Sequence, residues 1–538
     1  MKIPERIRSF YPFLGIILIF LSYPSYNIAP LRFFPLFAWF SLVPFFYYIR
    51  KAKSLPPLYP RLFLFAVLAN LLTYGWMGSF GNTIPYGDVV LLIVFIPTIS
   101  VILATKILVC EFLSRRYPSA RLFVFPAVWL MFDFLQSYGY LAFPWTYWGY
   151  SQYPVLPLVQ AASITGVYGI TFLLVLSNTV LTDLLYRSDG RFSVSHLARP
   201  EYVFFATLVA VILVGGTLRT ARVGAGEKTD DGDLKLSLIQ TCISPWENWM
   251  ENRYSYLDEL IQVTNRAVEE NRPDLVIWSE SATLEPLTHD VQHNMLDSFG
   301  RLLVSYVKAL DIPLLTAEIG MFESETGEYG YDYANSAAVI EPDGSIRQQY
   351  SKIHLAPIGE WFPYDRWFPG LREYLESMGS SSFTPGDAPF LFSLDSYRYA
   401  CLICYEGMFP RLTTHYKRTG ADFLVNITND GWSDYYSGHM QHYAASVFRA
   451  VENGIWYVRV GNTGYTVIID PYGNETESIP ILEPGYVNGS IDIRQNIDTF
   501  YARFGDLFTI AVAGILCLYI IGAEYARFGT VRNKTEEN

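Results

Sequence analysis

The chain has 538 residues, which is too long for one ordinary domain, so we expect at least two. Hydrophobic residues make up 51% and aromatic residues 17%, but charged residues only 17%. This excess of apolar residues is concentrated in residues 1–220 and indicates a membrane protein. The net charge of −12 argues against nucleic acid as a partner, and five cysteines in such a length are not a disulfide framework.

Apolar runs long enough to cross a bilayer predict about eight membrane helices. Because more apolar runs follow the first one at once, we interpret it as a retained helix and not as a cleaved signal peptide. The predicted spans are residues 9–24, 28–49, 60–79, 87–112, 121–138, 158–186, 200–218 and 506–524.

The basic residues predict the orientation of these spans. Lysines and arginines precede the first span and cluster in alternate loops, whereas the loops near 80–86 and 139–157 contain none; Arg32 is the one exception. The positive-inside rule therefore puts the N-terminus in the cytoplasm. We expect membrane helices 1 to 7 in residues 1–220, an outward-facing domain in 221–500, and helix 8 with a cytoplasmic tail in 501–538.

Residues 221–500 are predicted to form an α/β domain. Strand-like runs interleave with amphipathic helical runs, and a strong turn at 341–344 predicts a hairpin. This order favours a layered sandwich over a single doubly wound sheet. The predicted strands are 234–240, 274–278, 313–319, 333–341, 345–350, 422–428, 456–460 and 465–469, and the predicted helices are 250–270, 290–310 and 438–453.

Two uncharged aromatic segments have alternative interpretations. The outer loop 143–150 is either an aromatic belt at the membrane interface or a surface that guides lipid tails toward the outer domain. The long loop 361–386 is either a lid that touches lipid or a segment whose aromatic residues pack on the domain's own core.

Cys404 is the candidate nucleophile. It ends an apolar strand-like run, and a short polar break containing glycine then opens a predicted helix. A thiol at such a turn stands above the edge of a sheet, and the following helix N-terminus favours a thiolate. The alternative is a buried core cysteine, which is the commoner situation for an isolated cysteine.

Two ionisable residues follow other strand-like runs and could meet Cys404 at the same end of a sheet. Glu280 is the candidate general base, because partial burial raises the proton affinity of a carboxylate. Lys352 could hold an oxyanion with a fixed charge, with the backbone N–H of Tyr405 as a second donor. Glu360 could orient Lys352 or carry protons. Taken alone, Glu280 and Lys352 also fit exposed surface positions.

Metal and redox chemistry have weak support. His439 and His442 stand three apart on a predicted helix without an adjacent carboxylate, which is a poor metal signature. Cys401 and Cys404 have the spacing of a redox pair, but on a strand this spacing points the two side chains to opposite faces. No glycine-rich phosphate loop follows a strand. We therefore expect no metal and no cofactor.

Several blocks together resemble the nitrilase, or carbon–nitrogen hydrolase, superfamily with its Glu–Lys–Cys triad. An outward-facing domain of this kind between seven membrane helices and one more is similar to the bacterial apolipoprotein N-acyltransferases. The blocks are residues 278–280, 350–360, 403–406, 428–432 and 441–453, with 143–145 and 149–152 resembling that family's membrane motif.

The resemblance implies a membrane helical bundle joined to an α-β-β-α sandwich that lies on the periplasmic side of the bacterial inner membrane. Cys404 would take an acyl chain from a phospholipid as a thioester and pass it to the N-terminal α-amine of a diacylglyceryl apolipoprotein. The resemblance also implies that Glu280 and Lys352 complete the triad. The further positions that it implies are Glu360, Tyr405 and Glu406 in supporting roles and Trp249 in substrate contact.

Two other functions are alternatives, and we expect the chain to act as a monomer. A membrane-anchored nitrilase-type amidase or hydrolase would give its acyl group to water and would not need the aromatic outer loops. A silent membrane scaffold or lipid-binding protein would not need Glu280, Lys352 and Cys404 together. A transporter is disfavoured because the spans contain few ionisable residues.

Overall fold

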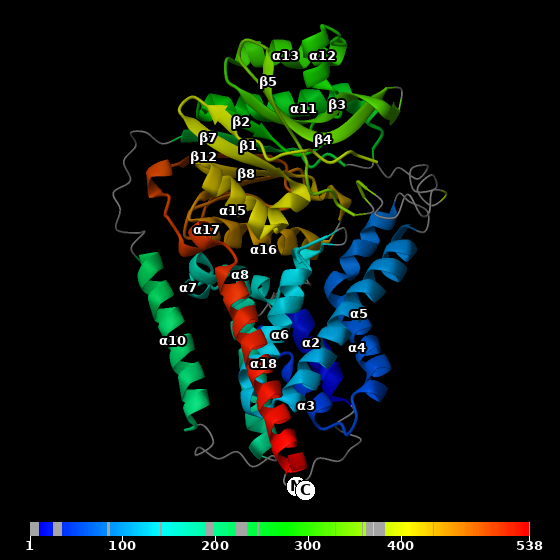
Figure 1. Ribbon diagram of the computed structural model, residues 1–538. Helices are drawn as coiled ribbons and strands as arrows, with labels where there is room; N and C mark the ends of the chain where they lie inside the picture. The colour runs from blue at the N-terminus through cyan, green and yellow to red at the C-terminus, as the bar shows by residue number, and fades with distance from the viewer. Residues whose placement is uncertain are drawn as a thin grey trace.

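The protein consists of a helical bundle and an α/β domain that sits at one end of it (Figure 1). The computed structural model describes residues 10–24, 35–82, 87–139, 142–188, 198–221, 234–244, 247–328, 330–357, 359–361, 370, 382–433 and 435–536. Most of the aromatic loop 361–386 lies outside these residues.

Within these residues, six helices are long and apolar enough to span a membrane: 56–79, 92–116, 118–135, 162–187, 200–221 and 507–528. The α-helices of the bundle are α2 (Tyr11–Ser22), α3 (Val43–Arg50), α4 (Tyr59–Tyr74), α5 (Gly87–Arg116), α6 (Arg121–Leu135), α7 (Leu156–Val159), α8 (Ala162–Ser188), α10 (Pro200–Ala221) and α18 (Leu507–Glu536). Its 3-10 helices are η1 (Pro35–Trp39), η2 (Pro56–Leu58), η3 (Gly75–Asn82), η4 (Pro118–Ala120), η5 (Pro144–Thr146) and η6 (Trp148–Gln152).

The predicted count of about eight spans is approximate because the first two are shorter than their apolar runs. α2 has 12 residues, and the described part of the second run is divided between η1 and α3. Pro35 begins η1 and Pro44 lies in the first turn of α3. A proline lacks the N–H that would continue a preceding helix, so an unbroken apolar run here does not make an unbroken helix.

The α/β domain contains two six-stranded sheets, which confirms the predicted sandwich. In spatial order the first sheet is β12 (Gly485–Ile491), β1 (Leu234–Gln240), β2 (Leu275–Trp278), β3 (Leu314–Glu328), β4 (Tyr331–Ile340) and β5 (Ile346–Ser351). The second is β11 (Glu475–Ile479), β10 (Thr466–Ile469), β9 (Trp456–Gly461), β8 (Phe423–Thr428), β7 (Tyr397–Ile403) and β6 (Phe392–Leu394).

Helices cover the outer face of each sheet, and the two inner faces share one apolar core. Along β7, Tyr399, Cys401 and Ile403 point into the core between the sheets, whereas Ala400 and Leu402 pack on the helical side. The first sheet is covered by α11 (Trp249–Glu270), α12 (Leu287–His293) and α13 (Ser298–Leu310). The second is covered by α15 (Pro410–Thr419) and α16 (Tyr436–Asn453), while η8 (Cys404–Met408) and η9 (Asp430–Trp432) follow β7 and β8. After β12 the chain continues through η10 (Ile493–Gln495) and α17 (Phe500–Phe504).

The outer aromatic loop lies between the bundle and the domain, where α16 covers it, so its tryptophans are buried and form no lipid-facing belt. The indole N–H groups of Trp76 and Trp145 donate to Gln441 Oε1 on α16 over 3.1 and 3.2 Å. The Trp145 ring also lies 5.1 Å from the His442 ring. The 143–150 loop therefore packs against α16, the helix that covers the second sheet.

A break in α8 also joins the bundle to the domain. Gly166 has a φ of +64°, and a Cβ there would lie 2.5 Å from the ring of Tyr501, so the position requires glycine. The break frees the amide of Val167, which donates to Glu452 Oε1 on α16 over 2.8 Å. Arg449 neutralises this carboxylate at 2.9 Å.

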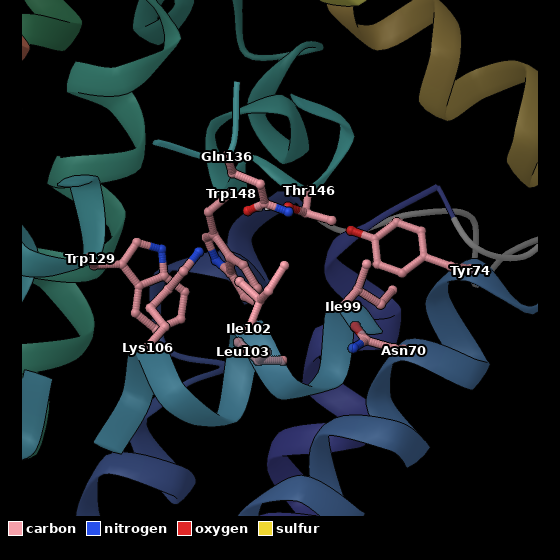
Figure 2. Close-up of a pocket in the computed structure, with 10 residues that line it drawn as sticks. All are labelled: Asn70, Tyr74, Ile99, Ile102, Leu103, Lys106, Trp129, Gln136, Thr146 and Trp148. Atoms are coloured by element: carbon pink, nitrogen blue, oxygen red, sulfur yellow. Dashed lines mark hydrogen bonds between the residues drawn. The ribbon is translucent and has the colours of Figure 1, made fainter. Parts of the chain in front are cut away.

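A small cavity lies inside the bundle (Figure 2). Its volume is about 40 Å³, enough for a few water molecules but not for an acyl chain. Lys106 on its wall pairs with the buried Asp133 and lies 4.8 Å from the ring of Trp129. The lining residues are Asn70, Tyr74, Ile99, Ile102, Leu103, Lys106, Trp129, Gln136, Thr146 and Trp148.

Candidate active site

Cys404 stands at a strained turn where β7 ends and η8 begins. Its φ is +51°, in the left-handed region, which costs an L-residue about 1–2 kcal/mol. The residue is 8% exposed. A strained strand-to-helix turn of this kind is a common way to hold a nucleophile out of the line of its strand.

Glu280 lies just past the end of β2 and is held at both carboxylate oxygens. Oε1 accepts from Asn335 Nδ2 over 2.8 Å, and Oε2 accepts from the backbone N–H of Asn429 over 2.7 Å. Burial raises the pKa of Glu280, and the nearby Lys352 opposes that shift. The residue therefore holds protons more tightly than an exposed glutamate, as a general base requires.

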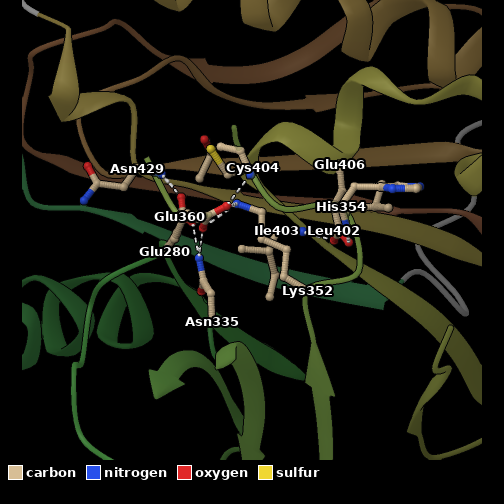
Figure 3. A network of polar contacts seen from close by, with 12 residues as sticks. Glu280, Asn335, Lys352, His354, Glu360, Leu402, Ile403, Cys404, Glu406 and Asn429 are labelled. Carbon is tan, nitrogen blue, oxygen red and sulfur yellow. Dashed lines mark hydrogen bonds and ion pairs between the residues drawn. The ribbon is translucent and has the colours of Figure 1, made fainter. Parts of the chain in front are cut away.

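Lys352 is completely enclosed, with 1% of its surface exposed, and lies between two carboxylates (Figure 3). Its Nζ is 2.8 Å from Glu360 Oε1 and 3.6 Å from Glu280 Oε1. Burial alone would lower the pKa of Lys352, but Glu360 and Glu280 outweigh it and raise the pKa above its ordinary value. The ammonium group therefore stays charged.

Glu360 has a structural partner for each of its oxygens. Oε1 accepts from Lys352 and, over 2.6 Å, from Asn335 Nδ2, while Oε2 accepts from the backbone N–H of Ala356 over 2.7 Å. Asn335 thus bridges Glu280 and Glu360 and fixes both carboxylates beside one lysine. This arrangement supports the expectation that Glu360 orients Lys352.

The thiol of Cys404 is neutral at rest. Burial and the charge of Glu280 raise its pKa well above the ordinary value, and Lys352 opposes this shift. An attack by sulfur therefore needs a group that removes the proton, and Glu280 is the buried base in this cluster.

Glu406 connects the nucleophile to the segment that holds Lys352. Oε2 accepts from the backbone N–H of Ile403 over 2.9 Å. Oε1 accepts from the Tyr350 hydroxyl and the Ile353 N–H, both at 2.7 Å, and from the His354 N–H at 3.1 Å. One buried side chain thus joins the end of β7 to the end of β5.

Changing Glu406 to glutamine is expected to lower the free energy of unfolding by about 2–4 kcal/mol. An amide must turn one N–H₂ group toward buried donors, so at least one backbone N–H loses its acceptor. Thermal unfolding in detergent measures the loss. The matched control is Glu477→Gln on the exposed strand β11, which is expected to leave stability unchanged. An equal effect of both changes would contradict this role for Glu406.

The two remaining predicted residues, Tyr405 and Trp249, make separate sets of contacts. Tyr405 faces the bundle: its hydroxyl donates to the Ala142 carbonyl over 2.8 Å, and its ring stacks on Trp145 at 6.3 Å. Trp249 begins α11, where its indole N–H contacts Glu285 Oε1 at 3.3 Å and its ring packs on Phe299. Trp249 thus belongs to a group of contacts separate from the Cys404 cluster, and its role in substrate binding stays a prediction.

A buried network behind Cys404 was missed by the sequence reasoning, which weighed His442 only as half of a weak metal pair. Among the described residues no group of three or more His, Cys, Asp or Glu could hold a metal. Instead, His442 contacts Asp430 Oδ1 at 2.8 Å and the Cys404 carbonyl at 3.2 Å. These residues come from α16, η9 and η8, so no local spacing links them.

A thiol, an ammonium and a buried carboxylate at the end of a double-sheet sandwich are the features of a nitrilase-type domain, here joined to membrane helices. Residues 235–494 match the family model of the carbon–nitrogen hydrolases, and residues 15–180 match that of the apolipoprotein N-acyltransferase N-terminal domain. The chain belongs to the apolipoprotein N-acyltransferase family. The protein is thus a multi-pass membrane N-acyltransferase of the carbon–nitrogen hydrolase superfamily.

Relatives named apolipoprotein N-acyltransferase cover most of the chain. The one from Geobacter metallireducens is 32% identical over 396 residues, 72% of either chain. The one from Chlorobaculum tepidum is 29% identical over 535 residues, 95% of this chain and 96% of its own. Among solved structures, an amidase from Nesterenkonia sp. is 18% identical, with a TM-score of 0.38, over 52% of this chain and 95% of that one.

Proposed function

We propose that this protein moves an acyl chain from a phospholipid to the N-terminal α-amine of a diacylglyceryl apolipoprotein, by way of a thioester on Cys404. The observation that supports this most directly is the cluster of Cys404, Lys352 and Glu280, in which a neutral thiol lies with a buried charge and a buried base. The names of the relatives supply the acceptor.

In the first half-reaction, Cys404 Sγ attacks the ester carbonyl of the phospholipid while Glu280 takes the thiol proton. Lys352 Nζ and the Tyr405 amide stabilise the oxyanion that forms. The carbon–oxygen bond of the ester then breaks, and the lysophospholipid leaves with the proton from Glu280. The acyl chain remains on sulfur as a thioester.

In the second half-reaction, the α-amine of the acceptor attacks the thioester carbonyl and gives a proton to Glu280. The same two donors stabilise the second oxyanion. The carbon–sulfur bond then breaks, the amide is released, and Cys404 recovers its proton. Because both substrates are lipids, a site facing the membrane bundle suits them, as the contact of Tyr405 with Ala142 supports.

We also propose where the protein lies in the cell and which residues form its membrane and catalytic parts. Residues 1–220 and 501–538 would carry the membrane helices, and 221–500 the catalytic domain on the periplasmic side of the inner membrane. The alternating basic clusters support this orientation. We propose that the protein acts as a monomer, since one chain supplies Cys404, Glu280 and Lys352.

The test uses the full-length protein in detergent with phospholipid and a labelled diacylglyceryl lipopeptide that has a free N-terminus. We expect the lipopeptide to gain the mass of one acyl chain and the Cys404→Ala variant to transfer none. Release of free fatty acid with an unchanged lipopeptide mass would instead support the membrane-anchored hydrolase. Transfer by Cys404→Ala would overturn the thioester route.

A further inference from the structure

We propose that His442 is a positioning residue: with Asn426 it holds the Cys404–Tyr405 peptide so that the Tyr405 N–H faces the reacting carbonyl. The inference deepens the proposed function and rests on it, because it takes that N–H as an oxyanion donor. His442 lies on α16 and Asn426 on β8, so the peptide is held from two different elements.

The evidence is the pair of donors on one carbonyl oxygen. The Cys404 carbonyl accepts from His442 Nε2 over 3.2 Å and from Asn426 Nδ2 over 3.2 Å. A carbonyl only accepts, so His442 Nε2 carries a proton in this contact. In a trans peptide the C=O and N–H groups point to opposite sides. Two donors that fix the Cys404 oxygen therefore turn the Tyr405 N–H away from the network.

The two donors are themselves fixed by buried charges. Arg459 Nη1 donates to Asn426 Oδ1 over 2.8 Å, which points the Asn426 amino group toward Cys404. Arg459 also pairs with Asp430, and Asp430 Oδ1 lies 2.8 Å from His442 Nδ1. Arg459, Asp430 and Asn426 are completely buried, and His442 is 1% exposed.

Asp430 carries the negative charge of this network. Burial alone would raise the pKa of Asp430, but Arg459 and His442 hold it well below its usual range. Asp430 therefore remains a carboxylate and holds Arg459, and Arg459 Nη2 donates to His442 Nδ1 over 3.1 Å, which leaves the imidazole proton on Nε2.

Gly407 lies close to the residues behind the turn. A Cβ on Gly407 would lie 2.8 Å from the Tyr457 hydroxyl and 3.1 Å from Asn426 Oδ1. Gly407 therefore allows η8 to approach Asn426 closely enough for the hydrogen bond to the Cys404 carbonyl. The left-handed φ of Cys404 points that carbonyl toward β8 and α16, where both donors stand.

The test separates acylation from the reactivity of the thiol itself. His442→Leu is expected to form the acyl-enzyme from p-nitrophenyl butyrate about 10- to 100-fold more slowly, with KM unchanged, because one support of an oxyanion donor is lost. Alkylation of Cys404 by iodoacetamide forms no oxyanion, so its rate should equal that of the wild type. His442→Gln, which keeps a donor of similar reach, should recover most of the acylation rate.

Asn426→Asp is a second variant with the same shape and no donor to the Cys404 carbonyl, and it should show the same selective loss. Asn453→Leu is the control for removing a buried polar side chain from α16, because Asn453 Nδ2 donates to Thr413 Oγ1 and to the Arg449 carbonyl and not to Cys404. Acylation at the wild-type rate in His442→Leu, or equal losses of acylation and alkylation, would overturn the inference.

The nitrophenyl ester needs no lipid recognition, so the test of His442 is independent of the lipid substrates. If the wild type takes this ester but ignores phospholipid, the proposed function fails and the variants still decide the role of His442.

Discussion

Changing Lys352 to methionine is expected to slow acyl-enzyme formation by a factor of about 10²–10³, the usual effect of losing one oxyanion donor. The protein should also lose about 3–5 kcal/mol of stability, because Glu280 and Glu360 would remain buried without their shared cation. Lysophospholipid released in a single turnover measures the first effect, and thermal unfolding in detergent measures the second.

The two effects can be separated by a second change. In the double variant Lys352→Met with Glu360→Gln, one of the two uncompensated carboxylates is gone. We expect this variant to regain part of the lost stability and none of the lost rate. Recovery of acylation in the double variant would mean that Lys352 acts only by neutralising Glu360 and not on the oxyanion.

Changing Glu280 to glutamine is expected to lower kcat/KM by a factor of about 10²–10⁴, the contribution of a general base. It should also change the pH profile. The base must be deprotonated to act, and burial raises its pKa above the ordinary 4.5, so wild-type activity is lost as pH falls through that raised value. The glutamine variant cannot titrate, and its residual activity should lack this acid limb.

Glu318→Gln is the matched control for that experiment. Glu318 lies on β3 of the same sheet, and burial raises its pKa to about 7. Its oxygens accept from Thr288 and Gln349, away from Cys404. Its loss should affect stability and leave the acid limb in place. An acid limb that survives in Glu280→Gln and disappears in Glu318→Gln would reverse the assignment.

Most of the strands and the candidate site residues could be proposed from the sequence because they follow local rules, whereas β6, β11 and β12 were not predicted. Alternation marks β1 and short apolar runs mark β2, β7 and β8, and an ionisable residue just past such a run made Glu280, Lys352 and Cys404 candidates. The structure brings these residues together where β2, β5 and β7 end. The 290–310 run is two helices instead of one because Asn294 takes a left-handed φ of 56° and ends α12.

The network behind Cys404 was not predictable in the same way. His442 is separated from Cys404 by 38 residues and from Asp430 by 12, and Arg459 reaches Asp430 from β9. These contacts depend on how α16 packs under the second sheet, which no short spacing records. The burial of the 143–150 loop could not be predicted for the same reason. The sequence gives the composition of the loop but does not show that α16 covers it.

The contact between Tyr405 and the 142–145 loop indicates a second role for the membrane helices besides anchoring the domain. The hydroxyl of Tyr405, the residue next to Cys404, donates to a carbonyl of the bundle, and its ring stacks on Trp145. The position of the Cys404 sulfur relative to the bundle is therefore set by the side chain of Tyr405, the next residue in the sequence. An α/β domain released from the helices would lose the contacts that hold the residue after Cys404, so the bundle helps to shape the candidate active site as well as to anchor the domain.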